Sequence, residues 1–165
     1  AIGAESMRVR RALVGDLDVI NGLTVEMHNH LGSLVGIKFN MEELKEEMYE
    51  NEDDLKNVYV AELDGKVVGY MAFSQEVKEN EFFGKYYHLY HIAVKQEHRG
   101  KGIATKLLNV LLQKAKREKV NIIVGTIAPN KEAIRFYQKL GFKPIYTSLV
   151  LDNTNKLKIP RATAN

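Results

Sequence analysis

The stretch HIAVKQEHRGKGIA, residues 91–104, decides the fold of this chain. Residues 86–94 are rich in aromatic and β-branched side chains, which predicts a strand. The apolar residues after Gly102 recur every three or four positions, which predicts an amphipathic helix. Gly100 and Gly102 let backbone N–H groups converge without interference from a Cβ atom, and a helix N-terminus behind such a loop attracts phosphate. The stretch therefore predicts a strand–loop–helix unit with an anion site in its loop.

Three kinds of phosphate-binding loop compete as interpretations of this stretch. A Walker loop needs Gly-x-x-x-x-Gly-Lys-Ser/Thr, which the chain lacks. A dinucleotide-binding turn needs a third glycine, where the chain has Thr105, and an acid at the end of the next strand, expected at 121–127, which carries none. The third kind has the pattern Arg/Gln-x-x-Gly-x-Gly/Ala, which residues 99–104 match. A structural turn that merely caps a helix is the alternative to all three.

A second motif, NKEAIRFYQKLGF, follows at residues 130–142. Residues 99–104 together with this motif resemble the GNAT superfamily of N-acetyltransferases, in its pyrophosphate loop and its Asn-x-x-Ala-x-x-Phe-Tyr-x-x-x-Gly-Phe helix. The resemblance extends over residues 7–151. It implies a single-domain α/β fold in which helices flank a mixed central sheet.

The periodicity of the sequence agrees with that fold and predicts the element order βααβββαβαβ. Strands are expected at residues 7–11, 58–63, 66–74, 86–94, 121–127 and 145–151. Helices are expected at residues 16–31, 40–50, 102–119 and 130–141. Asp16 is a suitable N-cap for the first helix, and Asp64-Gly65 suits a type I′ hairpin turn. Residues 76–85 are expected to form a charged loop.

The resemblance implies acetyl-CoA (coenzyme A) as the cofactor and assigns residues to it. Loop backbone groups and one hydroxyl would bind the pyrophosphate, through Arg99, Gly100, Lys101, Gly102, Ile103, Ala104 and Thr105. The preceding strand would offer backbone hydrogen bonds to the pantetheine arm, at Ile92, Ala93 and Val94. Asn130 would contact the cofactor, cap its own helix, or do both. Arg135 and Lys139 would reach a 3′-phosphate or remain solvated.

Tyr137 matches the tyrosine that the family uses as general acid toward the departing thiolate; the alternative is an aromatic core residue beside Phe136. A backbone amide near Ala93 or Val94 would stabilise the carbonyl oxygen. Strand 86–94 lacks the carboxylate base of some family members, and His88 is the best candidate for that base. The alternative for His88 is a surface or hydrogen-bonded core histidine. Strand alternation places His88 and Tyr90 on one face and His91 on the other.

The acceptor side is expected at the first two helices. The resemblance places substrate contacts at Glu26, His28 and His30, with Tyr90 on the neighbouring strand. Histidines at i and i+2 do not share a helix face, so no metal role is expected for any histidine. The second predicted helix is acidic, which indicates either a cationic amine acceptor (a polyamine, a lysine side chain or a protein N-terminus) or a merely solvated face.

The net charge of +3 conceals a division along the chain. Residues 16–64 hold 13 acids and 3 bases, and residues 95–143 hold 12 bases and 3 acids. The basic excess falls on the loop and helices expected to hold an anionic cofactor. These bases are spread around two helices and no aromatic stacking platform accompanies them, so no nucleic-acid partner is expected.

The remaining composition narrows the function class. The chain has 165 residues and no cysteine, so disulfides, thiolate metal sites and cysteine nucleophiles are excluded. No apolar run reaches the ~20 residues of a membrane span. We therefore expect a cytoplasmic enzyme without a membrane partner, acting on a small-molecule or peptide amine, with a homodimer compatible with the family.

Two further expectations concern the chain ends and the rival function. Residues 1–6 are open to interpretation as a cloning scar, and 152–165 as a polar tail. A non-catalytic acyl-CoA-binding sensor of the same fold is the alternative function.

Overall fold

The computed structural model describes residues 6–157, so residues 1–5 of the expected scar and 158–165 of the expected tail lie outside the described residues. Six strands are present: β1 (Met7–Arg11), β2 (Val58–Leu63), β3 (Lys66–Phe73), β4 (Lys78–Asn80), β5 (Gly84–Val94) and β6 (Asn121–Val124). The α-helices are α1 (Leu17–Ser33), α2 (Ile103–Glu118) and α3 (Lys131–Lys139). Short 3-10 helices occupy Val14–Asp16 (η1), Lys45–Glu47 (η2), Glu52–Leu55 (η3) and Gln96–His98 (η4).

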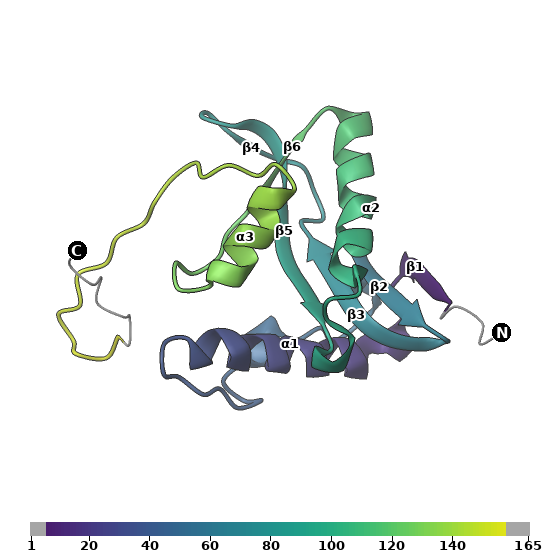
Figure 1. The fold of residues 1–165 in the computed structure, drawn as a ribbon, viewed down its shortest axis with the longest axis horizontal. Coiled ribbons are helices and arrows are strands. Elements are labelled where there is room, and N and C mark those ends of the chain that lie inside the picture. Colours follow the sequence, from purple (N-terminus) through teal and green to yellow (C-terminus); the bar gives the residue numbers. More distant parts are fainter. Residues whose placement is uncertain (1–5, 158–165) are drawn as a thin grey trace.

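The strands form one mixed sheet with β5 at its centre (Figure 1). β1, β2 and β3 pair in antiparallel order, and β3 pairs with the second half of β5. β4 pairs with the start of β5 antiparallel, and β6 pairs with its first half in parallel. The predicted single-domain α/β fold with a mixed sheet is confirmed.

Two apolar clusters lie on opposite faces of this sheet. On one face α2 buries Ile103, Leu107, Leu108 and Leu111 against the strands, and aromatic residues of α3 pack at the edge of that cluster. On the other face α1 buries Ile20 and Leu23. The 3–4 spacing of the apolar residues in α2 is the pattern that the sequence showed, so the helix lies where its stripe predicts. In the described part of the chain, no helix has the length and apolarity to cross a membrane.

The predicted hairpin turn is confirmed by its backbone. Asp64 has a φ of 50° and Gly65 a φ of 80°, the left-handed conformations that a type I′ turn requires at both central positions. The turn joins β2 to β3 and fixes their register, in which Leu63 lies opposite Lys66.

Asp16 plays a different role from the predicted side-chain cap. Its carboxylate makes no capping bond in α1 and instead accepts from the Arg10 guanidinium, at 2.7 and 3.1 Å, and from the backbone N–H of Leu13. Arg10 also donates to Glu62 at 2.7 Å. The guanidinium therefore ties β1 and β2 to the start of α1, and it holds the pKa of the Asp16 carboxyl below its usual range.

Three predictions about segments are wrong. Residues 40–50 form turns and the short helix η2 instead of an α-helix, because like-charged glutamates recur along the segment and only Leu44 is buried among residues 40–47. Residues 145–151 form no strand: they run away from the sheet with exposed side chains and gain no partner edge (Figure 1). The expected loop 76–85 contains β4, which pairs with the start of β5.

Replacing Asp16 with Asn tests the Arg10 network. We expect the free energy of unfolding to fall by about 2 kcal/mol at pH 7, because a charge-assisted and largely buried acceptor is lost. The folded pKa is lowered, so this stabilisation is fully present above the unfolded pKa of about 4 and is lost as pH falls through the folded pKa. Urea unfolding of the variant and the parent should therefore differ at pH 7 and converge at acid pH.

Asp18→Asn is the matched control for this experiment, since Asp18 is an exposed aspartate two residues after Asp16, in the first turn of α1. It should change stability by less than about 0.5 kcal/mol. Equal effects of the two substitutions, or a difference that persists at acid pH, would contradict the role given to Asp16.

Candidate active site

The site begins where β5 and β6 part. Their pairing runs from Tyr86 opposite Asn121 to Leu89 opposite Val124 and then stops. In β5, Tyr86 pairs with both β4 and β6, and Leu89 pairs with both β3 and β6. β6 therefore lies along one edge of β5, and β3 and β4 lie along the other. Among residues 6–157 no strand continues along that edge beyond Leu89. Backbone groups of residues 90–94 on that edge are therefore left for another partner.

A cavity of about 780 Å³ occupies this opening. Its wall contains the second half of β5, the loop into α2, residues of α1, the segment after β6 and the aromatic pair Phe136 and Tyr137 of α3. The wall includes nearly all of the predicted cofactor residues: Ile92, Ala93, Val94, Arg99, Gly100, Gly102, Ile103, Ala104, Thr105, Asn130 and Tyr137. Lys101 is in the same loop but not in this wall.

The loop has the conformation of an anion cradle. Gly100 and Gly102 have φ values of 78° and 79°, which L side chains rarely adopt, and apart from the adjacent residues no described atom lies within 4 Å of where their Cβ atoms would be. α2 begins directly after Gly102, so its unpaired N–H groups face the cavity end of the loop. The Arg99 side chain donates to the Val94 carbonyl at 3.1 Å and lies 3.5 Å from the Glu26 carboxylate. Arg99 thus holds the loop against β5 and α1.

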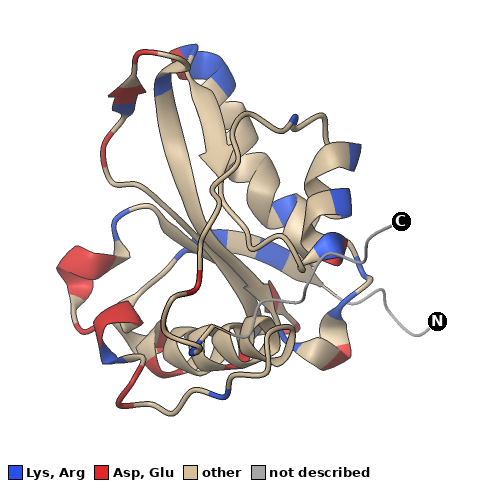
Figure 2. Cartoon of the chain, turned by 90° about the vertical axis from the view of Figure 1, so that its left-hand side faces the viewer, with Lys and Arg blue, Asp and Glu red and all other residues tan. Residues whose placement is uncertain are grey.

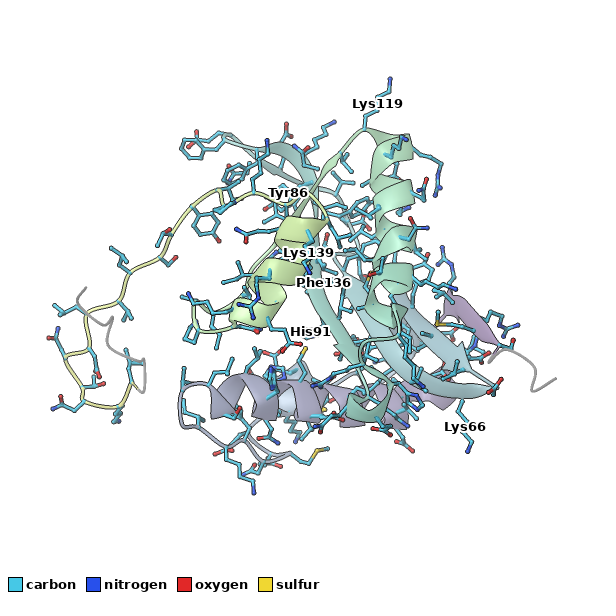
Figure 3. The ribbon with its side chains drawn as sticks, viewed as in Figure 1. Lys66, Tyr86, His91, Lys119, Phe136 and Lys139 are labelled. Atoms are coloured by element: carbon cyan, nitrogen blue, oxygen red, sulfur yellow. The ribbon has the colours of Figure 1, made fainter. Side chains whose placement is uncertain are left out.

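The second motif supplies another wall of this cavity. Asn130 caps α3 by accepting from Ala133 N–H, and it also lines the cavity, so both of its predicted interpretations are compatible with the structure. Tyr137 packs edge-on against Phe136 and Phe142, and burial raises its pKa to about 12. Its phenol is therefore protonated at neutral pH. Arg135 and Lys139 are exposed on α3 and do not line this cavity. Figure 3 shows Lys139 on α3.

His91 lies on a different face from the one predicted. The pairing of β3 with β5 shifts between Ala72 and Phe73, which lie opposite His91 and Leu89, so Tyr90 is an extra residue in β5. This bulge interrupts strict alternation and brings His91 to the same side as His88 and Tyr90. Figure 3 shows His91 in the space between α1 and α3.

A buried chain of hydrogen bonds fixes the His91 ring. The Thr24 hydroxyl donates its single proton to the Ile20 carbonyl at 3.0 Å. In its 2.7 Å hydrogen bond with Tyr70, Thr24 Oγ1 must therefore accept, and the Tyr70 hydroxyl donates. The Tyr70 oxygen then accepts from His91 Nδ1 at 3.2 Å. His91 is consequently the tautomer with hydrogen on Nδ1 and a lone pair on Nε2. Burial and nearby His28 lower its pKa, which favours the neutral ring.

A second cavity, of about 380 Å³, adjoins the first and shares Tyr90, His91 and Gly125 with it. His88 lines the smaller cavity, and burial together with Lys78 lowers its pKa. Acidic residues from the 46–54 segment contribute to the wall: Glu46, Glu47 and Asp54. In Figure 2 acidic residues gather around the short helices between α1 and β2, away from the basic faces of α2 and α3.

The predicted substrate contacts divide between the two cavities. Tyr90 borders both, whereas Glu26, His28 and His30 line only the larger one. The sequence did not identify Tyr70, Glu47 or His91 as site residues. No spacing signal marks Glu47 or His91, because an irregular turn brings the first to the site and a strand bulge the second. Tyr70 lies in a regularly paired part of β3 and is linked to the site through its hydrogen bond to His91.

Comparison with known proteins gives the family. The pattern of the acetyltransferase (GNAT) family matches residues 25–142. This range contains the glycine loop, the part of β5 that lines both cavities, and the α3 motif. The chain therefore belongs to the GNAT family of acetyltransferases, as the two motifs predicted.

Curated relatives match part of the chain. Mouse N-acetyltransferase 8F1 is 36% identical over 86 residues, covering 52% of this chain and 38% of the relative. An N-alpha-acetyltransferase of Sulfurisphaera tokodaii is 38% identical over 96 residues, covering 53% and 56%. The match thus spans 38% and 56% of the length of these two relatives.

Among solved structures, the aminoglycoside N-acetyltransferase AAC(6')-Iy in complex with CoA has a TM-score of 0.67. Its sequence identity is 16%, with 93% of this chain and 99% of that chain covered. This likeness shows the shared fold.

Proposed function

We propose that the chain transfers an acetyl group from acetyl-CoA to a primary amine, by direct attack of the amine while both substrates are bound. The observation that carries the proposal is the parting of β5 and β6 above a glycine loop, which provides one continuous wall for a long anionic ligand. Membership of the GNAT family and the names of relatives in that family support the reaction type.

The residues present fit acetyl-CoA. The loop from Arg99 to Thr105 offers backbone N–H groups at a helix N-terminus to a pyrophosphate, and its two left-handed glycines leave the approach open. The free edge of residues 92–94 offers hydrogen bonds to the amide groups of a pantetheine arm. Asn130 and Tyr137 lie across the same cavity.

In the proposed mechanism, acetyl-CoA when bound supplies an acetyl group activated as a thioester. A new C–N bond forms at the acetyl carbon as the C–S bond breaks. A cationic acceptor first releases one proton to solvent and attacks as the neutral amine. His88 accepts the second proton, which the nitrogen loses as the amide forms, and Tyr137 donates its phenolic proton to the departing sulfur. A backbone N–H near Ala93 or Val94 stabilises the developing negative charge on the carbonyl oxygen.

The acceptor is proposed to be a cationic amine, such as a polyamine, a lysine side chain or a protein N-terminus. Glu46, Glu47 and Asp54 surround the smaller cavity with negative charge, and Tyr49 and Tyr90 add aromatic rings. Lys56, the basic residue in the same wall, is paired with Glu76 at 2.8 Å. A smaller cavity of this character concentrates cations next to the junction with the larger one.

Isothermal titration with acetyl-CoA, followed by mass spectrometry of an amine panel, tests the reaction. We expect saturable binding below millimolar concentration and a mass gain of one acetyl group on at least one amine. The panel should contain polyamines, small neutral amines and peptides with free N-termini. Absence of binding at millimolar acetyl-CoA would refute the proposal, and binding without any acetylation would favour a non-catalytic sensor.

Tyr137→Phe separates the acid from the binding role. We expect kcat to fall by about 10²-fold, since proton donation to the leaving thiolate is lost. The Kd for acetyl-CoA should stay within about threefold, because the ring that packs against Phe136 is retained. Steady-state kinetics and calorimetry measure the two quantities. Tyr146→Phe is the control at an exposed tyrosine, and an unchanged kcat in Tyr137→Phe would remove the general-acid role.

Glu46→Lys tests the preference for a cation. Reversing this charge in the wall of the smaller cavity should raise KM for a polyamine acceptor about fivefold at low salt and less at high salt. A neutral amine should show little change. Glu42→Lys, an exposed reversal outside that wall, is the matched control. Equal shifts in KM for both variants would show a general charge effect and contradict a cation subsite.

A further inference from the structure

Three side chains with metal-ligating atoms converge beside the junction of the two cavities. His28 comes from α1, Glu47 from η2 and His91 from β5, and one ligand atom of each lies within 4.8 Å of the others. His91 Nε2 is 4.0 Å from Glu47 Oε2. The two imidazole rings are 5.9 Å apart between centroids and nearly perpendicular.

Hydrogen bonds leave the same nitrogen free on each histidine. His28 Nδ1 lies 2.9 Å from the Thr24 carbonyl, which can only accept, so the hydrogen of the neutral ring is on Nδ1. His91 Nδ1 donates to Tyr70, as the chain through Thr24 requires. Both rings therefore carry their lone pair on Nε2. Metal-binding histidines typically have this arrangement, with the other ring nitrogen hydrogen-bonded to a carbonyl or similar group.

The geometry allows a small contraction onto an ion. In a tetrahedral zinc site with bonds near 2.0–2.1 Å, neighbouring ligand atoms are about 3.3 Å apart, so the three atoms must close by roughly an ångström. The two rings are held by their hydrogen bonds, whereas the Glu47 side chain is 50% exposed on a short helix. The carboxylate is consequently the ligand that moves.

We propose that His28, His91 and Glu47 bind a divalent transition-metal ion of the Zn²⁺ type, with a fourth position open to water or another ligand. Two imidazoles and one carboxylate form a recognised zinc donor set, whereas Ca²⁺ and Mg²⁺ prefer oxygen ligands. The expectation from the sequence that histidines have no metal role rested on His28 and His30. The proposed site instead uses His28 with His91, which are 63 positions apart in the chain.

Bound metal would restrict the route between the cavities. His91 lines both cavities, His28 the larger one and Glu47 the smaller one. An ion held by all three would lie where an acceptor amine approaches the cofactor, so Zn²⁺ is inferred to inhibit acetyl transfer in competition with the acceptor. This consequence rests on the proposed function, whereas the metal site itself does not.

Metal binding by the chelator-treated chain tests the site. Competition of Zn²⁺ with a chromophoric chelator should show one tight site, and Co²⁺ should give the visible absorption of a four-coordinate ion. His28→Gln, His91→Gln and Glu47→Gln should each weaken Zn²⁺ affinity at least about tenfold. Tyr70→Phe should weaken it by about 10-fold as well, because His91 loses the partner that fixes its tautomer.

Matched controls distinguish this site from adventitious binding. His30→Gln alters a histidine in the wall of the larger cavity, and Glu42→Gln alters an exposed acid near Glu47; both should keep the Zn²⁺ affinity within about twofold. Circular dichroism and the Tm establish that each variant is folded, and Glu47→Gln, at an exposed position, is the variant least dependent on packing.

Failure of the metal site is distinguishable from failure of the proposed function. No Zn²⁺ binding at 100-fold excess over protein, or equal affinity in Glu47→Gln and Glu42→Gln, would overturn the site whatever the outcome with acetyl-CoA. Calorimetry with acetyl-CoA alone tests the function independently. Tight Zn²⁺ binding without inhibition of transfer would retain the site and refute only its competition with the acceptor.

Discussion

The separation of β5 from β6 after Leu89 and Val124 is the constraint on which the rest of the structure depends. Two parallel strands that remained paired would satisfy each other's backbone groups and leave no space between them. Once they part, N–H and C=O groups along residues 90–94 lie in a partly enclosed space, where an unpaired group is costly. Such an edge favours a ligand that carries its own amide groups and completes the hydrogen bonding of the sheet.

The bulge at Tyr90 decides which side chains reach that space. With regular alternation, His91 would face the α2 side of the sheet, where Leu89 and Ile92 pack. The extra residue instead turns His91 toward α1, where Tyr70 and Thr24 bind it. The same irregularity therefore connects the buried hydrogen-bond chain to the junction of the two cavities. A substitution at buried Tyr70 would therefore affect the site indirectly, by removing the hydrogen bond that orients His91.

The sequence predicted the parts of the fold that follow from local pattern. Asp64-Gly65 specified its turn because few residue pairs adopt two successive left-handed conformations, and α2 followed from a regular apolar stripe. Residues 145–151 have the composition of a strand, but a strand needs a partner edge as well as a pattern, and pattern alone cannot show one. β4 was missed for the converse reason, since a charged three-residue segment pairs only because β5 extends back to Gly84.

Candidate site residues were predictable to the extent that a motif carries them. The loop and Tyr137 lie where continuous motifs place them, because backbone conformation and helix position are local properties. Glu47 and His91 come to the site through an irregular turn and a register shift, and neither leaves a periodic signal. The proposed acceptor side draws Glu47 and His91 from such irregular elements, so a sequence motif is least informative where specificity would be decided.

The division of charge along the chain has a different meaning in three dimensions. Many of the basic residues of α2 lie near its C-terminal end, about 24 Å from the glycine loop for a helix of 16 residues. Lys114 pairs there with Glu118 at 2.9 Å, and Lys119 follows the helix (Figure 3). The proposed anion site would depend chiefly on backbone N–H groups, whereas Glu46, Glu47 and Asp54 lie directly in a cavity wall. The acidic segment is therefore the more informative half of the charge pattern, because its charges face a space that a substrate can enter.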